Sequence, residues 1–339
     1  MKKIVIAFLF LSMLDACKND KNTPDVSNIK ADLQVQRFDQ DFFELDTTDL
    51  DASLDKLNQK YPAFLQDFLF NILSQPSHPD SIKKDVRLFL SSYRSLYDSS
   101  KQLFNNLDKE AALVKKGLQF IKHYFPKYQA PAKLITFIGP INSYSSVITS
   151  DALAVGLQLY MGKNYSIYNT PAGQQLYPAF VSRRFEREYI PVNSIKNIVD
   201  DLSDNVYRNT TTGKPLVEQM IEVGRRLYVL DHLLPEVDDT LKTGYTKAQL
   251  EGAYANESNI WGFFITNDLL YKNDPATIRD YMNDSPNTTA LGPASPGFIG
   301  QFIGWQIVKK WMDKEGKTLD ELMKTPAKQI FDEAKYKPS

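Results

Sequence analysis

The segment at residues 177–190 reads YPAFVSRRFEREYI and combines a dense charge cluster with a repeating apolar position. At about 100° per residue, every fourth residue of this segment falls on one stripe of a helix. The stripe holds Tyr177, Val181, Phe185 and Tyr189. Arg184 and Glu188 fall beside it, on the inward side, and a charged pair is costly to bury unless it is partnered. The sequence therefore predicts a central helix that carries an inward Arg–Glu pair.

A small sheet is expected to precede this helix, because short apolar runs alternate with turn residues there. Strand patterns cover residues 33–38, 133–138, 145–149 and 152–160. Helical patterns cover most of the remaining chain: residues 49–73 with a break near Tyr61-Pro62, 81–104, 107–125, 192–202, 215–234, 247–271, 275–282, 297–312 and a final helix from Thr325-Pro326. The predicted fold class is α+β and mostly helical.

Local signals mark the helix starts in the C-terminal half. Thr246 with Gln249, and Thr318 with Glu321, have the spacing of capping boxes. Ser295-Pro296 is an N-cap followed by proline at the first helical position. The helix that it opens is apolar nearly all round, which predicts a central position, and its glycines permit close helix approach. Without an internal repeat or a linker, residues 31–339 are expected to form a single domain.

The N-terminus indicates export. Two lysines precede an apolar run at residues 4–14, which is too short to span a bilayer. It ends just before Cys17, the only cysteine of the chain. This arrangement resembles a bacterial lipoprotein signal peptide, so residues 1–16 would be removed, Cys17 lipidated, and residues 17–30 would form a flexible tether. An ordinary signal peptide with an incidental cysteine is the alternative.

Composition excludes several kinds of site. A net charge of −1 leaves no electrostatic footprint for nucleic acid, and three histidines with one cysteine leave few ligands for zinc. Neither H-E-x-x-H nor G-x-S-x-G occurs. We therefore expect no catalytic residue, metal or cofactor. Four tyrosines before the predicted central helix could line a groove or form core: Tyr160, Tyr165, Tyr168 and Tyr177.

Several short segments, taken together, resemble the gliding motility lipoprotein family GldB of Bacteroidetes. They are RRFEREYI at 183–190, EQMI at 218–221, Asp231 with Leu234-Pro235, GYT at 244–246, NIWGFF at 259–264, SPG at 295–297, IGWQIV at 303–308 and KYKP at 335–338. The resemblance implies a lipoprotein anchored in the outer membrane. It also implies protein partners in the gliding and type IX secretion machinery of the envelope.

A second resemblance is to predicted zinc peptidases of the gluzincin type, in which a small sheet precedes the metal-binding helix. The best register places Arg184 and Glu188 at the two histidine positions and Phe185 at the general base. Val223 takes the third-ligand position, beside Glu222. The resemblance thus implies a zincin-like scaffold that has lost its metal site, since zinc activates water only when ligands hold it.

These observations predict a non-catalytic, zincin-like envelope lipoprotein that acts in motility or secretion. One alternative is a divergent hydrolase with Glu186, Glu188 or Glu222 as its acid or base. The other is a lipoprotein that binds a glycan or another solute through the tyrosine cluster. The candidate degenerate site consists of Arg184, Glu188 and Glu222.

Overall fold

The computed structural model describes residues 23–74 and 79–338. Within these ranges the chain is mostly helical around one four-stranded sheet, so the predicted α+β class is confirmed. The predicted signal peptide, Cys17 and the tether up to residue 22 lie outside the described residues. In the described part of the chain, no helix combines the length and the apolar character needed to cross a membrane.

The sheet has the order β1-β2-β4-β3. Its strands are β1 Gln34–Gln36, β2 Lys133–Phe137, β3 Ser146–Ile148 and β4 Leu153–Gly156. The central strand β2 pairs in parallel with β1 and β4, and β3 returns antiparallel to β4. β4 is buried along its length and β2 is buried beyond its first residue, as expected for strands covered on both faces.

The strand predicted at 152–160 is wrong beyond Gly156, where the chain turns into the 3₁₀ helix η2 Leu157–Leu159. The buried Gln158 side chain explains the end of the strand. Its Oε1 accepts a hydrogen bond from the Gly139 backbone N–H at 3.0 Å, and its Nε2 donates to the Tyr144 carbonyl at 3.1 Å. A side chain therefore satisfies backbone groups there that a longer strand would have paired.

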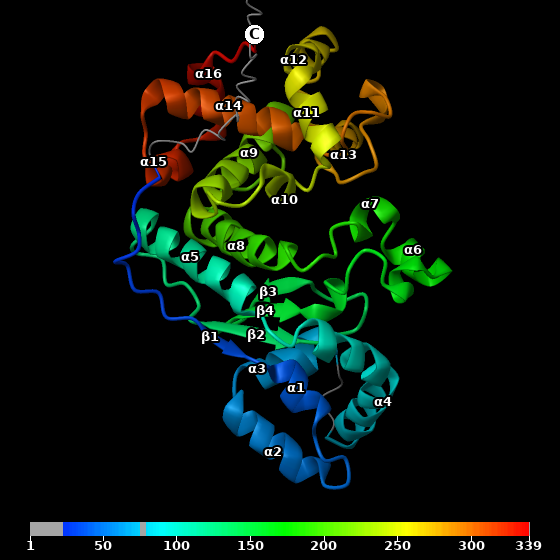
Figure 1. The fold of residues 1–339 in the computed structure, drawn as a ribbon. Helices are drawn as coiled ribbons and strands as arrows, with labels where there is room; N and C mark the ends of the chain where they lie inside the picture. The colour runs from blue at the N-terminus through cyan, green and yellow to red at the C-terminus, as the bar shows by residue number, and fades with distance from the viewer. Residues whose placement is uncertain (1–22, 75–78, 339) are drawn as a thin grey trace, which may run out of the picture.

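One face of the sheet is covered by the N-terminal helices (Figure 1). They are α1 Phe38–Phe43, α2 Leu50–Lys60, α3 Phe64–Gln66, the π-helical turn η1 Asp67–Ile72 and α4 Pro79–Leu103. The buried Phe38 ring is the hub of this layer, with ring centroids at 4.8–5.4 Å from Phe42, Tyr61, Phe64 and Phe68. The predicted break near Tyr61-Pro62 is confirmed.

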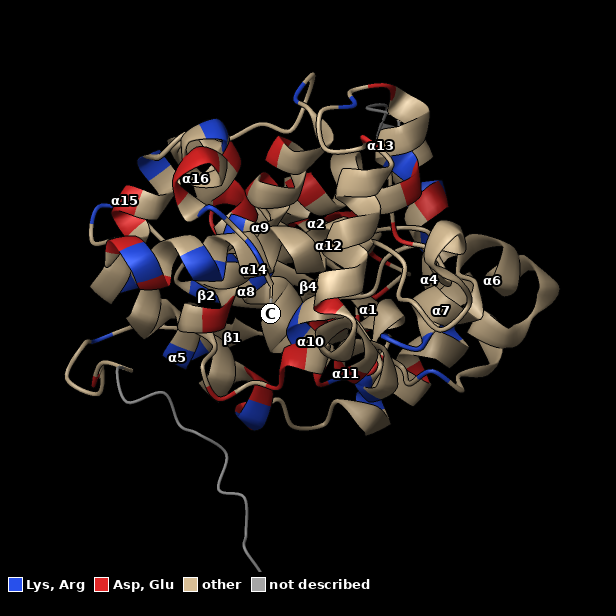
Figure 2. Cartoon of the chain, turned by 90° about the horizontal axis from the view of Figure 1, so that it is seen from above, with Lys and Arg blue, Asp and Glu red and all other residues tan. Residues whose placement is uncertain are grey.

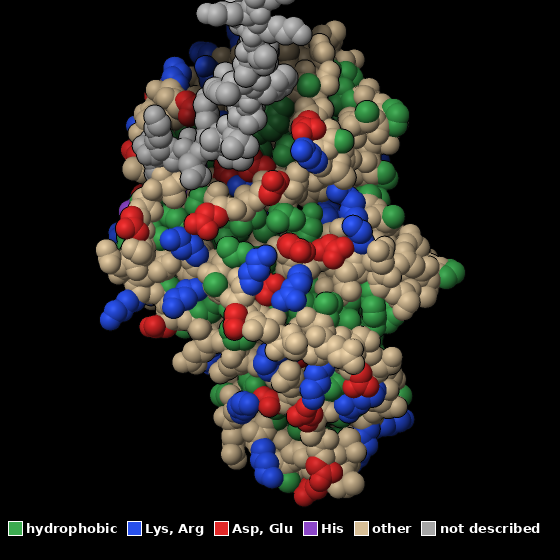
Figure 3. All heavy atoms as spheres, viewed as in Figure 1, with side chains coloured by type: hydrophobic (Ala, Val, Ile, Leu, Met, Phe, Trp, Pro, Cys, Tyr) green, Lys and Arg blue, Asp and Glu red, His purple; other side chains and the backbone are tan. Residues whose placement is uncertain are grey.

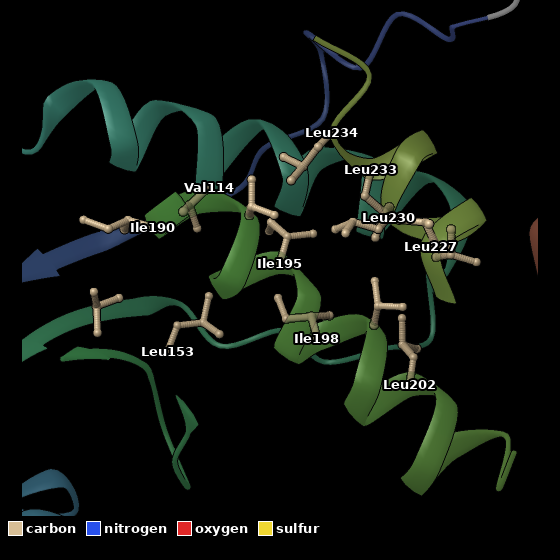
Figure 4. Close-up of a cluster of buried hydrophobic side chains, with 14 of the residues drawn as sticks. Val114, Leu153, Ile190, Ile195, Ile198, Leu202, Leu227, Leu230, Leu233 and Leu234 are labelled. Atoms are coloured by element: carbon tan, nitrogen blue, oxygen red, sulfur yellow. The ribbon is translucent and has the colours of Figure 1, made fainter. Parts of the chain in front are cut away.

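The other face carries α5 Asp108–Tyr124 and α8 Tyr189–Asp201, and α9 Leu216–Leu233 packs on both of them. Figure 4 shows isoleucine side chains of α8 meeting leucine side chains of α9, with Val114 of α5 in the same cluster. Because α8 lies between the sheet and α9, it is buried on two sides. A π-helical turn, η4 Leu202–Val206, continues it.

The outermost layer centres on α14 Ile299–Glu315, which is buried at every position from Ile299 to Val308, so its predicted central place is confirmed. It crosses α9 where Gly224 faces Gly304: a methyl group on Gly304 would lie 1.7 Å from the Met220 carbonyl oxygen. The helix begins later than predicted, because Gly297 packs against the Ser285 backbone and Phe298 adopts a left-handed conformation with φ of 56°. Ser295 is therefore not its N-cap.

Short helices surround α9 and α14. They are α10 Asp239–Thr243, α11 Lys247–Ala255, α12 Glu257–Thr266, α13 Pro275–Met282, η5 Thr289–Leu291, α15 Leu319–Lys324 and α16 Ala327–Ala334. Both predicted capping boxes are present. The single helix predicted at 247–271 is wrong, because Asn256 leaves helical geometry and its side chain bonds the Gly252 carbonyl.

The helix predicted at 177–190 is also wrong. After η3 Ser166–Asn169 and α6 Pro171–Leu176, the chain forms only the four-residue α7 Ala179–Ser182 and then turns until α8 begins at Tyr189. In the turn, the Gly162 backbone N–H donates to the Phe185 carbonyl at 2.8 Å. A carbonyl that a helix would have used internally thus bonds a distant loop.

The glycine contact between α9 and α14 makes a first prediction. Replacing Gly304 by Ala pushes two helix backbones apart and should lower the free energy of unfolding by about 2 kcal/mol or more. Gly252 is the matched control, because it lies inside α11 with open space around its Cα. Gly252→Ala should be neutral or stabilising by up to about 1 kcal/mol. Denaturant unfolding measures both, and equal effects would contradict the close contact.

Candidate functional site

The turn between α7 and α8 is held by charged side chains that bond to separate parts of the fold. Arg187 forms a two-pronged pair with the buried Glu110 of α5, Nε to Oε1 at 2.7 Å and Nη2 to Oε2 at 3.0 Å. Glu186 accepts a hydrogen bond from the Lys163 backbone N–H at 3.2 Å. Arg183 donates to the Gly244 carbonyl at 2.6 Å. The turn is therefore fixed from three sides.

Beside this turn lies a cavity of about 280 Å³. One wall is a single face of α8, since its contributions recur at helical spacing: Tyr189, Val192, Asn193 and Lys196. The turn supplies Arg183, Arg184 and Phe185, and the end of α10 with the connection after it supplies residues 241–245. The start of α14 and the loop before it close the far side. Sequence segments more than a hundred residues apart thus meet at one cavity.

Positive charge dominates the cavity lining. Arg184 forms an ion pair with Asp284, which is the only acidic residue among the described residues that line the cavity. Burial lowers the pKa of Arg183, and the neighbouring Arg184 charge lowers it further. Lys242 is buried, but Asp231 and Asp239 neutralise it from behind. Lys196 is exposed and has no ion-pair partner within the described chain. Arg183 and Lys196 consequently have no carboxylate partner among the described residues.

Two tyrosines complete the lining. Burial raises the pKa of Tyr189, although the nearby Arg183 and Arg184 oppose that rise. Burial also raises the pKa of Tyr245, whose hydroxyl donates to the Phe298 carbonyl at 2.9 Å. Both phenols are therefore neutral at ordinary pH. Tyr245 anchors the left-handed Phe298, and such strained backbone is often found at functional sites.

Three segments that carry the family resemblance supply residues to this cavity: 183–190, 244–246 and 295–297. Gly244 has φ of 71°, and Arg184 packs so closely against it that a methyl group there would lie 3.0 Å from a guanidinium nitrogen. Sequence reasoning missed the site as a whole, because it treated the three segments separately. Their common occurrence in one resemblance was the available signal.

The predicted degenerate site is not assembled. Arg184 lines the cavity, but Glu188 is exposed and makes no ion pair among the described residues, so the inward Arg–Glu pair is wrong. The pair required a continuous helix, and α7 ends at Ser182. Glu222 lies elsewhere, buried on α9, where it accepts from Lys214 at 2.6 Å and lies 3.4 Å from Arg225. It holds a structural ion cluster.

The tyrosine groove is corrected as well. Tyr160 and Tyr168 are about 99 % and fully buried, so neither lines an open groove. The Tyr168 hydroxyl donates to the Gln158 carbonyl at 2.6 Å, and Tyr177 donates to the Ile141 carbonyl at 2.9 Å. The Tyr165 ring contacts Tyr168 edge to face. Tyr168 and Tyr177 both pack against Phe185, at 5.0 and 4.9 Å between ring centroids. Tyr160 and Tyr168 thus belong to the core, and the partly buried Tyr165 and Tyr177 pack against it.

The described residues contain no group of three or more His, Cys, Asp and Glu side chains that could hold a metal ion. Charge elsewhere is dispersed: Figure 2 shows basic and acidic residues interspersed around the molecule, with none on α6 or α7. Figure 3 shows the same mixture, together with apolar patches, on the face of Figure 1. Among the described residues that line the cavity, basic side chains outnumber acidic ones four to one.

Comparison with known proteins gives one family. The family described as gliding motility protein GldB matches residues 19–338. No curated protein and no solved structure matches the chain. The family resemblance drawn from the sequence is confirmed by this match. The zincin-like resemblance receives no support from it, and it stays a prediction.

The arginine contacts make a second prediction. Because Glu110 is buried, Arg187→Met leaves the Glu110 carboxylate without its partner and should lower the free energy of unfolding by about 2–4 kcal/mol. Glu110→Leu should lower it by a similar amount. The double variant should cost clearly less than the sum. Arg184→Met with Glu188→Leu is the control, because these residues do not pair, and their effects should add within about 0.5 kcal/mol. Double-mutant cycles from denaturant unfolding measure both coupling energies. A stronger coupling between Arg184 and Glu188 than between Arg187 and Glu110 would contradict the structure.

Proposed function

The chain belongs to the family of gliding motility protein GldB, and from this membership we propose a specific role. It acts as a lipid-anchored, non-catalytic component of the outer membrane that supports the gliding and type IX secretion machinery. The observation that carries the proposal is the extent of the match, which covers residues 19–338. A match over nearly the whole chain supports a shared role for the entire domain, beyond a shared local motif.

The anchor is proposed at Cys17. The family match starts close behind this residue, and the positively charged start and apolar run before it fit a lipoprotein signal peptide. A lipid chain would hold the protein at a membrane without a spanning helix.

The non-catalytic role is supported by where the candidate acids lie. Glu186 is bonded to the 162–163 loop, Glu188 is exposed, and Glu222 is paired with Lys214 and Arg225. A hydrolase needs its acid or base within hydrogen-bond reach of a bound substrate. None of these three carboxylates lines the cavity formed by the described residues. Their positions favour the non-catalytic proposal over the hydrolase alternative.

The decisive experiment removes the gene from a gliding host and restores it in two forms, wild type and Glu186→Gln/Glu188→Gln. Colony spreading and the amount of protein exported by type IX secretion are the readouts. Both forms should restore both readouts, because neither glutamate is needed for chemistry. Loss of gliding with the double variant, at normal protein level, would favour the hydrolase alternative. Unchanged gliding and secretion in the deletion strain would refute the motility role.

An affinity pull-down tests for partners. Protein solubilised from envelope membranes should co-purify with components of the gliding or secretion machinery. The matched control is the same tag on an unrelated outer-membrane lipoprotein. Recovery of the same proteins with both baits would contradict a specific assembly.

Lipidation makes a third prediction. Cys17→Ala removes the thiol that would carry the lipid, so the protein should move from the outer-membrane fraction to the soluble envelope fraction. Cell fractionation with immunodetection measures the shift, and Ser27→Ala provides a substitution in the same region that should leave partition unchanged. A Cys17→Ala protein that still sediments fully with outer membrane would show that lipid at Cys17 is not the anchor.

Metal content makes a fourth prediction. Because the positions that would correspond to zinc ligands hold Arg184, Glu188 and Val223, mildly purified protein should contain no stoichiometric zinc. Elemental analysis after gel filtration without chelator measures this directly. One tightly held zinc per chain would revive the peptidase alternative.

A further inference from the structure

The lining of the cavity beside α8 includes two neighbouring guanidinium groups, those of Arg183 and Arg184, and one carboxylate, that of Asp284. Arg184 takes Asp284 as its ion-pair partner, which leaves Arg183 without a carboxylate among the described residues. Arg183 is half-buried and bonds only neutral acceptors there, the Phe180 and Gly244 carbonyls and the Gln249 amide. A partly desolvated cation without a counter-ion is unfavourable. An anion entering the cavity would relieve this cost.

Hydrogen-bond donors that face the cavity are also left over. Arg183 uses Nε and Nη2, so its Nη1 makes no hydrogen bond within the described chain. Arg184 uses only Nη2. The Tyr189 hydroxyl lines the same space and has no partner in the described residues. These donors, together with the exposed Lys196 ammonium, can receive the oxygens of a carboxylate or phosphate.

The start of α14 adds to the positive field. The N-terminal Phe298 and Gln301 of this seventeen-residue helix line the cavity, and helix N-termini carry partial positive charge. Gln301 itself is held by the Thr243 carbonyl at 2.9 Å. The start of α14 is therefore held in place, so its partial positive charge can act on an anion without a rearrangement of the chain.

Apolar side chains also line the cavity: Val181, Phe185, Val192, Leu241 and Phe298. A cavity that combines cations with aromatic and aliphatic side chains fits an amphipathic small molecule. Its volume of about 280 Å³ admits a ligand of one ring or a short chain and is too small for a folded partner.

We propose that this cavity binds a small organic anion, with its carboxylate or phosphate group against Arg183, Arg184 and Lys196 and its apolar part against Phe185 and Val192. The binding site is independent of the lipid anchor and of the motility role. The four tyrosines of the predicted groove take no part in it, because none of them lines the cavity.

Isothermal titration calorimetry of the detergent-solubilised protein tests the proposal with three matched probes: phenyl phosphate, benzoate and the neutral benzyl alcohol. We expect at least one anion to bind and benzyl alcohol not to bind. Preference for phenyl phosphate would identify a phosphate ligand, and preference for benzoate a carboxylate. Added salt should weaken binding, because exposed charges are screened. Failure of both anions to bind at millimolar concentration, or equal binding of benzyl alcohol, would refute the proposal.

Variants locate the site. Lys196→Gln and Arg183→Gln should each raise the Kd about tenfold, the effect of losing one charge-assisted hydrogen bond. Lys115→Gln, a similar exposed change on α5, should leave it unchanged. If Arg183→Gln fails to fold, because it loses the Gly244 contact, Lys196→Gln and Tyr189→Phe decide. Neither of those side chains has a hydrogen-bond partner in the described chain. Equal affinity in Lys196→Gln, Tyr189→Phe and Lys115→Gln would place the anion elsewhere and overturn the assignment.

Discussion

The close contact between Gly224 of α9 and Gly304 of α14 is the constraint on which the packing of these two helices and their neighbours depends. It allows α9 and α14 to cross with their backbones in van der Waals contact, so that most residues of both helices are buried. α9 then reaches α5 and α8 on its other side. Because α14 also supplies Phe298 and Gln301 to the cavity, this crossing determines where one cavity wall stands relative to α8. Packing far from the cavity thereby sets its shape.

A second set of contacts determines the opposite wall. Arg187 joins the turn to α5, and Arg183 joins it to the connection after α10. A partly buried ion pair contributes little net stability over an apolar pair of similar shape, because its desolvation offsets its attraction. These contacts instead position the turn, because each arginine side chain reaches its acceptors only when the turn lies where it does. The position of one cavity wall therefore depends on the crossing of α9 and α14, and that of the other on the turn between α7 and α8.

Charge is distributed in a way that bears on function. The buried Glu222 is neutralised by Lys214 and Arg225, and the buried Lys242 by Asp231 and Asp239. These buried charges thus serve the fold. The cavity lining is mostly cationic, and its one carboxylate among the described residues, Asp284, is paired with Arg184. Such a surface suits recognition of an anion. The proposed non-catalytic role and the proposed anion site are therefore compatible.

The α+β class, both capping boxes, the break near Tyr61 and the central place of α14 could be predicted from the sequence alone. Each of these follows from local periodicity or from residues three or four apart. The sequence also carried the family resemblance and the hypothesis of a lipidated Cys17. The three-dimensional fold was needed to show that residues 183–188 form a turn, that the four tyrosines belong to the core or pack against it, and that residues 183–190, 244–246 and 295–297 contribute to one cavity. The reason is physical: periodicity reports local energies, whereas the turn is held by Glu110 and Gly244. Bonds to residues so distant in sequence outweigh helical preference and leave no trace in local spacing.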